Sequence, residues 1–150
     1  MNSAVVAFRD FDYSDAGIYG FTIQNAEYGV MVLNGGSPEI KWCIVRDITL
    51  GGDGGFYLAG DGIGSSPTVS ECLIYGNESN SGEGGGIRVA SNNGSSSAII
   101  RNSTITLNSP EGIRVHGNAT IVDVSNSIIY NNDISITNLG TINLSFSNVD

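Results

Sequence analysis

The stretch AIIRNSTITLN, residues 98–108, decides the fold, because the same pattern recurs before and after it in the chain. An apolar strand ends at Arg101 and Asn102, a small residue follows at Ser103, and a second strand has Ile105 at its centre. A strand pattern that recurs about every 20–50 residues with variable turns is typical of a repeat protein. The positions equivalent to Ile105 are Ile23, Val45, Ile74, Ile129 and, at the end of the chain, Asp150.

Each repeat unit contains three short strands, and no stretch of the chain has sustained helical periodicity. The first strand precedes the small residue (98–102), the second begins on it (103–108), and the third usually follows a glycine (112–116). Such strands predict a coiled ribbon in which each coil pairs in parallel with the next, about 4.8 Å away. Alternation in the third strands predicts these inward side chains: Val30, Val32, Phe56, Leu58, Ile87, Val89, Ile113, Val115, Ile134 and Ile136.

Residues at the same phase of successive coils are expected to form columns. Stacked asparagines can form amide ladders, and asparagine also tolerates the left-handed backbone of a sharp corner. The ladder is predicted at Asn25, Asn77, Asn108 and Asn132, and the corner at Asn102, Asn126 and Asn148. Cys43 and Cys72 share an inward phase with Ser103 and Ser127, which favours a buried column of small side chains; a disulfide is the alternative that the spacing allows.

Length and composition indicate one all-β domain over residues 1–150, with a first strand and loop at 1–17 and coils at 18–150. The first strand is expected at Ala4–Phe8. The net charge of −9 argues against nucleic acid and anionic membranes as partners, because both need a basic surface. No apolar run approaches the roughly 20 residues of a membrane span, and no signal peptide is visible in this chain.

Three segments carry a resemblance to a known family: GFTIQN (20–25), SPTVSECLIYGN (66–77) and GGGIRV (84–89). They resemble the repeats of the pectin-lyase-like superfamily. The resemblance implies a single-stranded right-handed parallel β-helix, here of about five three-strand coils with no clear capping helix. It also implies a bacterial protein, for example one carried on a mobile element, and an extracellular or cell-surface location if the chain is part of a longer protein. A coil end left open would invite pairing with a second copy, so a homo-oligomer is expected.

The outward side chains of the third strands form two columns. The first reads Met31, Tyr57, Arg88, Arg114 and Ser135, and the second reads Leu33, Ala59, Ala90, His116 and Thr137. The tyrosine, the two arginines and the histidine are therefore a candidate ligand-binding patch. Stacked guanidinium groups repel each other unless an anion lies between them, and a uronate or sulfate is one such anion. The alternative is that Glu83 and Glu111 pair with the arginines on a solvated surface.

Acidic residues gather in the long turns of the middle coils, at Asp47, Asp53, Glu78 and Glu83. Several carboxylates among glycines are candidate ligands for Ca²⁺, which binds about six to eight oxygens. Their spacing matches neither an EF-hand nor the nonapeptide β-roll, so solvated acidic turns are the alternative. No other cofactor is expected.

An apolar stripe is predicted on the outward face of the second strands. It contains Ile44, Leu73 and Ile128, flanked by Tyr75 and Tyr130. Apolar side chains exposed on successive coils indicate a covering loop or a subunit interface.

Two functions remain open at this point. The first is a non-catalytic module that binds carbohydrate or a partner subunit through its outer strand faces and middle-coil turns. The second is a polysaccharide lyase or epimerase, in which Arg88 or Arg114 neutralises a uronate while His116 or Tyr57 moves the proton. Against the enzyme, the outward columns contain no paired carboxylates, and His116 has no evident nucleophile beside it.

Overall fold

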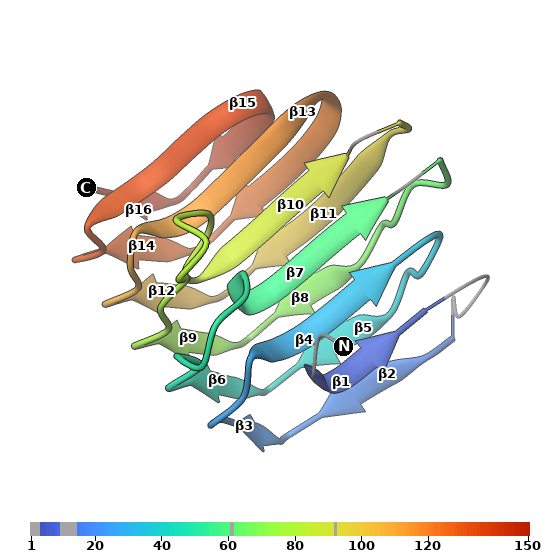
Figure 1. The fold of residues 1–150 in the computed structure, drawn as a ribbon. Coiled ribbons are helices and arrows are strands. Elements are labelled where there is room, and N and C mark those ends of the chain that lie inside the picture. The colour runs from blue at the N-terminus through green and yellow to red at the C-terminus, as the bar shows by residue number, and fades with distance from the viewer. Residues whose placement is uncertain (1–3, 10–14, 61, 92) are drawn as a thin grey trace.

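The computed structural model describes residues 4–9, 15–60, 62–91 and 93–150, and all of its elements are β-strands (Figure 1). The strands are β1 (Ala4–Phe8), β2 (Gly17–Tyr19), β3 (Thr22–Ile23), β4 (Tyr28–Leu33), β5 (Glu39–Lys41), β6 (Ile44–Arg46), β7 (Gly54–Gly60), β8 (Thr68–Ser70), β9 (Leu73–Tyr75), β10 (Ile87–Ser91), β11 (Ser96–Arg101), β12 (Thr104–Thr106), β13 (Glu111–Ser125), β14 (Ile128–Tyr130), β15 (Ile134–Ser145) and β16 (Asn148–Val149). The described part of the chain contains no helix of the length and apolarity that a membrane crossing needs.

The strands pair in parallel, each with the equivalent strand of the next coil, which confirms the predicted parallel β-helix. One sheet has the order β3-β6-β9-β12-β14-β16 and forms one side of the coil. The other runs β1-β4-β7-β10-β13 and returns as β11-β8-β5-β2, so it forms the two remaining sides. Figure 1 shows the reason: β13 and β15 bend over at one end and join two sides that separate strands form in the other coils.

The core is a stack of apolar columns. Ile23, Val45, Ile74, Ile105 and Ile129 lie in register, and each is almost completely buried. The last member of the column is Val149, so the prediction of Asp150 is wrong by one residue. The small side chain of the last coil is Ser147, and the strand centre follows it by two residues, as Ile105 follows Ser103.

The third-strand alignment is confirmed up to β13, where the predicted inward side chains from Val30 to Val115 are all buried. In the last coil the pairing differs by two residues. Ile136 pairs with Ile113, Thr137 with Arg114 and Leu139 with His116. The predicted places of Ser135 and Thr137 in the outward columns are therefore wrong. No glycine introduces β15, so the sequence lacked the marker that aligns the earlier coils; the side chains of Ile134 and Ser135 lie outside the described residues.

Both corners that flank the second strands have left-handed backbone. The residues with positive φ before the strand are Trp42, Glu71, Asn102, Asn126 and Phe146, and those after it are Asn25, Asp47, Gly76, Leu107 and Asn131. Asn148 instead pairs with Ile128 inside β16, so its prediction as a corner residue is wrong. Asn25 is a corner residue and not a ladder residue, because the ladder asparagine of a coil is the residue directly after the corner.

The predicted amide ladder is confirmed for Asn77, Asn108 and Asn132. Asn77 Nδ2 donates to Asn108 Oδ1 at 3.0 Å, and Asn108 Nδ2 donates to Asn132 Oδ1 at 3.0 Å. The backbone N–H groups of Asn77 and Asn108 also donate to the carboxamide of the next coil, at 3.2 and 3.0 Å. The side-chain amides of these asparagines therefore have hydrogen-bond partners inside the coil, where an unpaired polar group would destabilise the fold.

The column of small residues is a second polar ladder. The backbone N–H of Cys72 donates to Ser103 Oγ, and that of Ser103 donates to Ser127 Oγ, both at 3.2 Å. Each hydroxyl donates in turn to the carbonyl two residues earlier, as Ser103 Oγ does to Arg101 at 2.9 Å. Cys43 and Cys72 are buried free thiols that occupy the same phase, and burial raises the pKa of Cys72 to about 11. The site therefore needs a small side chain that hydrogen-bonds, which cysteine and serine both supply.

Candidate binding surfaces

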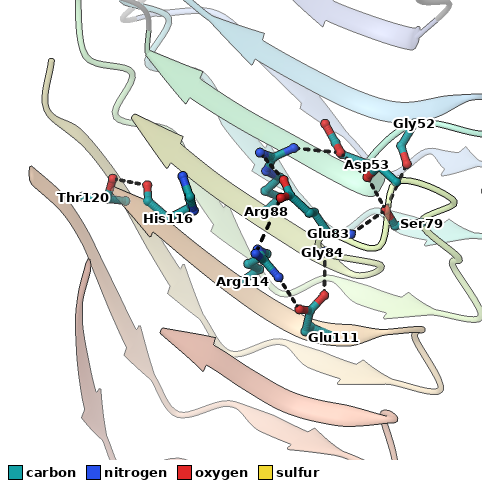
Figure 2. A network of polar contacts seen from close by, with 11 residues as sticks. Gly52, Asp53, Ser79, Glu83, Gly84, Arg88, Glu111, Arg114, His116 and Thr120 are labelled. Atoms are coloured by element: carbon teal, nitrogen blue, oxygen red, sulfur yellow. Dashed lines mark hydrogen bonds and ion pairs between the residues drawn. The ribbon is translucent and has the colours of Figure 1, made fainter. Parts of the chain in front are cut away.

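The predicted outward column of β7, β10 and β13 is assembled as expected. Tyr57 pairs with Arg88, and Arg88 pairs with Arg114. The Arg88 guanidinium lies 5.3 Å from the centroid of the Tyr57 ring. Neither arginine is solvated, because each side chain is only 16% exposed. The turns between the second and third strands bring Asp53 and Glu83 to this face (Figure 2).

The carboxylates of those turns surround the two arginines (Figure 2). Arg88 pairs with Asp53 at 2.8 Å and with Glu83, and Glu83 also lies 3.6 Å from Arg114. Arg114 pairs with Glu111 at 2.7 Å. Glu83 therefore bridges the two stacked guanidinium groups, which is the role that an external anion would otherwise fill. The interpretation that Glu83 and Glu111 pair with the arginines is confirmed, although the pairs are largely buried and not on a solvated surface.

Backbone contacts hold the turns in this closed arrangement. Glu111 is almost fully buried, and its second oxygen accepts from the backbone N–H of Gly84 at 2.7 Å. Ser79 Oγ donates to the carbonyl of Gly52 at 3.0 Å and accepts from the backbone N–H of Glu83 at 3.2 Å. We define the closed arginine cluster as Asp53, Glu83, Arg88, Glu111 and Arg114. The cluster contains two cations and three carboxylates, so the negative charge of its carboxylates exceeds the positive charge of its arginines.

His116 lies apart from this cluster in Figure 2. It pairs along the sheets with Ala90 and Leu139, and its carbonyl accepts from Thr120 Oγ1 at 2.8 Å. Its Nδ1 is buried without a hydrogen-bond partner. The structure thus brings together Tyr57, Arg88 and Arg114 and leaves His116 outside their ion-pair network.

The four candidate calcium ligands separate into different places. Asp53 and Glu83 both pair with Arg88. Asp47 is an exposed corner residue that pairs with Arg46 at 3.2 Å, and Glu78 is exposed on its turn. Among the described residues, no group of three or more His, Cys, Asp and Glu side chains lies close enough together to hold a metal ion. Calcium binding by the turns stays a prediction.

The predicted apolar stripe faces outward on β6, β9 and β14. Leu73, Ile128 and Tyr130 are exposed, and Ile44 and Tyr75 are partly buried. The pairing of β9 with β12 and of β12 with β14 places a threonine in each column of the stripe, at Thr104 and Thr106. The stripe is therefore interrupted by hydroxyl groups at one coil, and its role as an interface stays a prediction.

Sequence reasoning missed a group of exposed aromatic and charged side chains at the corner after β5. Trp42 is 57% exposed, Tyr19 is 47% exposed, and their ring centroids lie 6.4 Å apart at an interplanar angle of 55°. Lys41 Nζ lies 4.5 Å from the centroid of the Trp42 ring and 3.3 Å from Glu71. The indole Nε1 of Trp42 donates to Glu71. We call Tyr19, Lys41, Trp42 and Glu71 the aromatic corner.

Hydrogen bonds at the aromatic corner change the acidity of its groups. The indole N–H of Trp42, followed by the Lys41 ammonium, holds the pKa of Glu71 below its ordinary value. The Tyr19 hydroxyl donates to Glu39 at 3.1 Å, and this hydrogen bond raises the pKa of Tyr19. Glu39 also lies 3.9 Å from Arg101 of a later coil. At neutral pH the corner therefore presents ionised carboxylates and fixed N–H groups beside two exposed rings.

A signal for this corner was present in the sequence. The equivalent positions in later coils are Glu71, Asn102, Asn126 and Phe146, and asparagine is expected where the backbone is left-handed. A tryptophan at the same phase departs from the turn chemistry of its own repeat. Aligning the corner positions, and not only the apolar ones, would have identified Trp42, Glu71 and Phe146 as exposed exceptions.

Comparison with known proteins gives one finding. A family model described as right handed beta helix region matches residues 9–150. Comparison with curated proteins gives no significant match, and comparison with solved structures gives none.

Proposed function

We propose that this chain, which belongs to the right-handed beta helix family, is a non-catalytic module that binds a glycan on the outside of its coils. The observation that carries the proposal is the contrast between two outer surfaces. The arginines that an enzyme would use on a uronate are bound by the carboxylates of their own turns. The aromatic rings of Tyr19 and Trp42 are exposed on a rigid coil and are free to contact a ligand from outside.

The closed arginine cluster is the argument against the lyase or epimerase alternative. A uronate would have to displace Glu83 or Asp53 from Arg88 before a guanidinium group could bind it. A uronate would give Arg88 a new partner, but a displaced Asp53, whose side chain is only 9% exposed, would be left buried without its cation. Of the two residues proposed to move the proton, His116 lies apart from that cluster in Figure 2, and Tyr57 lies beside Arg88, with 5.3 Å between its ring centroid and the guanidinium group.

Exposed aromatic rings supply what a glycan-binding surface needs. A sugar ring has an apolar face of C–H groups and an edge of hydroxyl groups. Aromatic side chains provide large and stiff contact area at low conformational cost, and polar groups beside them fix the orientation of the ligand. The aromatic corner has both features within one exposed region.

The proposal is tested with two assays on the same protein. Binding is measured by isothermal calorimetry over a panel of neutral and acidic oligosaccharides, and lyase activity is followed by the absorbance of unsaturated uronides on pectate, alginate and glycosaminoglycan. We expect binding of at least one glycan and no rise in absorbance. Failure of every glycan to bind contradicts the proposal, and a rise in absorbance that Arg88→Ala or Arg114→Ala abolishes supports the enzyme instead.

A further inference from the structure

We infer that the aromatic corner is the glycan site of this chain and that it takes a neutral sugar. The inference rests on the proposed function and adds the place and the ligand class to it. Three features of the corner carry it: the unfavourable position of Trp42, the fixed orientation of its ring, and the balance of charge around it.

The first feature is that an exposed tryptophan stands at a backbone position that bulky side chains disfavour. Its backbone φ is 57°, in the left-handed region that bulky residues disfavour and that asparagine occupies in later coils. Its side chain is 57% exposed, so burial contributes little in return. Phe146 is also an exposed ring at the equivalent corner of another coil, so the backbone position of Trp42 points to a binding site only together with the two features below.

The second feature is that the ring is oriented before any ligand arrives. The indole N–H is hydrogen-bonded to Glu71, and Glu71 is held in turn by Lys41 at 3.3 Å. Tyr19 is anchored through its hydroxyl to Glu39 at 3.1 Å. A ligand that stacks on these rings therefore loses little affinity to ordering them, because preorganisation lowers the entropic cost of binding.

The third feature is the charge, which selects against an acidic sugar. The ionised groups around the rings are Lys41 and Arg101, paired with Glu71 and Glu39, so the corner has no net charge of its own. Both cations already have carboxylate partners, and the whole chain has a net charge of −9. A uronate would find no unpaired guanidinium or ammonium group here. The hydroxyl groups of a neutral sugar can donate to the carboxylates and accept from the ammonium without separating them.

The chain offers a direct probe of this site, because Trp42 is its one tryptophan. Intrinsic fluorescence of the full chain is titrated with neutral oligosaccharides (cello-, xylo-, manno- and malto-hexaose) and with hexagalacturonate. We expect a saturable shift of the emission with at least one neutral ligand and no change with hexagalacturonate. A saturable response to hexagalacturonate alone overturns the neutral assignment.

Variants distinguish an effect on binding at the aromatic corner from an effect on the stability of the fold. Trp42→Asn introduces the residue that later coils use at this corner, so we expect thermal stability at least equal to the parent and a loss of affinity of tenfold or more. Glu71→Gln is expected to weaken binding severalfold. The matched control is Phe146→Ala, which removes a 92% exposed aromatic ring from the equivalent corner of a different coil, and we expect its affinity to equal that of the parent.

The outcomes distinguish this inference from the proposed function. If Trp42→Asn leaves glycan binding in calorimetry unchanged, the aromatic corner is not the binding site, and the proposed function as a glycan-binding module still stands. An equal loss of affinity in Trp42→Asn and Phe146→Ala overturns it as well, because the effect would not be specific to the aromatic corner. Failure of all glycans to bind contradicts the proposed function itself.

Discussion

Glu111 is the most buried carboxylate of the closed arginine cluster. Its side chain is 4% exposed, pairs with Arg114 and accepts from the N–H of Gly84. Glu111 stands at the start of a third strand, so its ion pair with Arg114, three residues later, could be predicted from the sequence. The hydrogen bond to Gly84 was not, because it joins a residue 27 positions away and depends on how the turn folds back.

We predict that Glu111→Ala lowers the free energy of unfolding by about 3 kcal/mol, because it leaves a largely buried guanidinium group and a buried N–H without their partner. Urea denaturation followed by circular dichroism measures the change. The control is Glu78→Ala, which removes an exposed carboxylate from the neighbouring turn and is expected to change stability by less than about 0.5 kcal/mol. Equal effects of the two substitutions would contradict the role given to Glu111.

A second prediction concerns Glu71 and the emission of Trp42. The pKa of Glu71 is lowered from its ordinary value of 4.5, so the hydrogen bond to the indole N–H is present above that value and is lost as the pH falls through the lowered one. We expect the fluorescence of the folded protein to titrate with a midpoint below 4.5. Glu71→Gln should abolish this titration, and a midpoint at or above the ordinary glutamate value would contradict the contact.

At the level of elements, the two polar ladders explain why strands of three residues are stable here. Such strands pair with few hydrogen bonds each, and the ladders add a side-chain bond to the backbone at both ends of the second strand. The sequence predicted the columns, since equal phase is visible as a repeated residue type. The sequence did not predict the hydrogen bonds of the Ser and Cys column. A column of small residues indicates only that small side chains are needed, until the positions of the backbone N–H groups are known.

We predict that Ser103→Ala destabilises the protein by about 1–3 kcal/mol, because the buried N–H of Cys72 loses its acceptor. Ser103→Cys, which introduces the residue found at this phase in earlier coils, should cost less than the alanine variant. Ser97→Ala is the control, since that hydroxyl bonds to Ser66 on the exposed side of β11. Thermal denaturation compares the three, and a neutral Ser103→Ala would show that the ladder contributes only through its size.

Strand order followed from the sequence wherever a marker residue was present. Glycine before the third strand and a small residue before the second aligned β3 to β14 correctly. In β15, where no glycine marks the strand, the predicted alignment was wrong by two residues, and at Val149 it was wrong by one residue although Ser147 supplies the small marker residue. The merging of two strands into β13 was also not predicted, because Gly117 and Asn118 have the composition of a turn although the backbone continues through them.

At the scale of the whole molecule, the repeat determined the fold but not the function. The predicted arginine patch was assembled in register, and pairing with Glu83 and Glu111 was one of the two interpretations that the sequence allowed. The ion pair with Asp53 was not predicted, because the path of the turn that carries it cannot be derived from the strand pattern. The aromatic corner was missed for a related reason. It joins Tyr19, Trp42 and Glu71 from three successive coils, and Trp42 and Glu71 occupy corner positions, which the apolar repeat does not align.

A prediction at this scale concerns self-association through the apolar stripe. We expect a concentration-dependent dimer in light scattering, and we expect Leu73→Asp with Ile128→Asp to give a monomer, because both side chains are exposed on the same face. The control is the pair Ile99→Asp with Ile121→Asp, which places the same charges on exposed positions of another side of the coil. A parent protein that stays monomeric at high concentration would remove the stripe from consideration as an interface.

The serine ladder has a consequence for how such a chain can lengthen. Ser103 and Ser127 lie 24 positions apart and make the same contacts to the coil on either side. A tandem duplication of the DNA that encodes residues 103–126 would therefore insert one complete turn whose donors, acceptors and apolar side chains match both neighbours. Insertion of a whole turn keeps the serine ladder continuous, so each such duplication would lengthen the outer surface by about 4.8 Å.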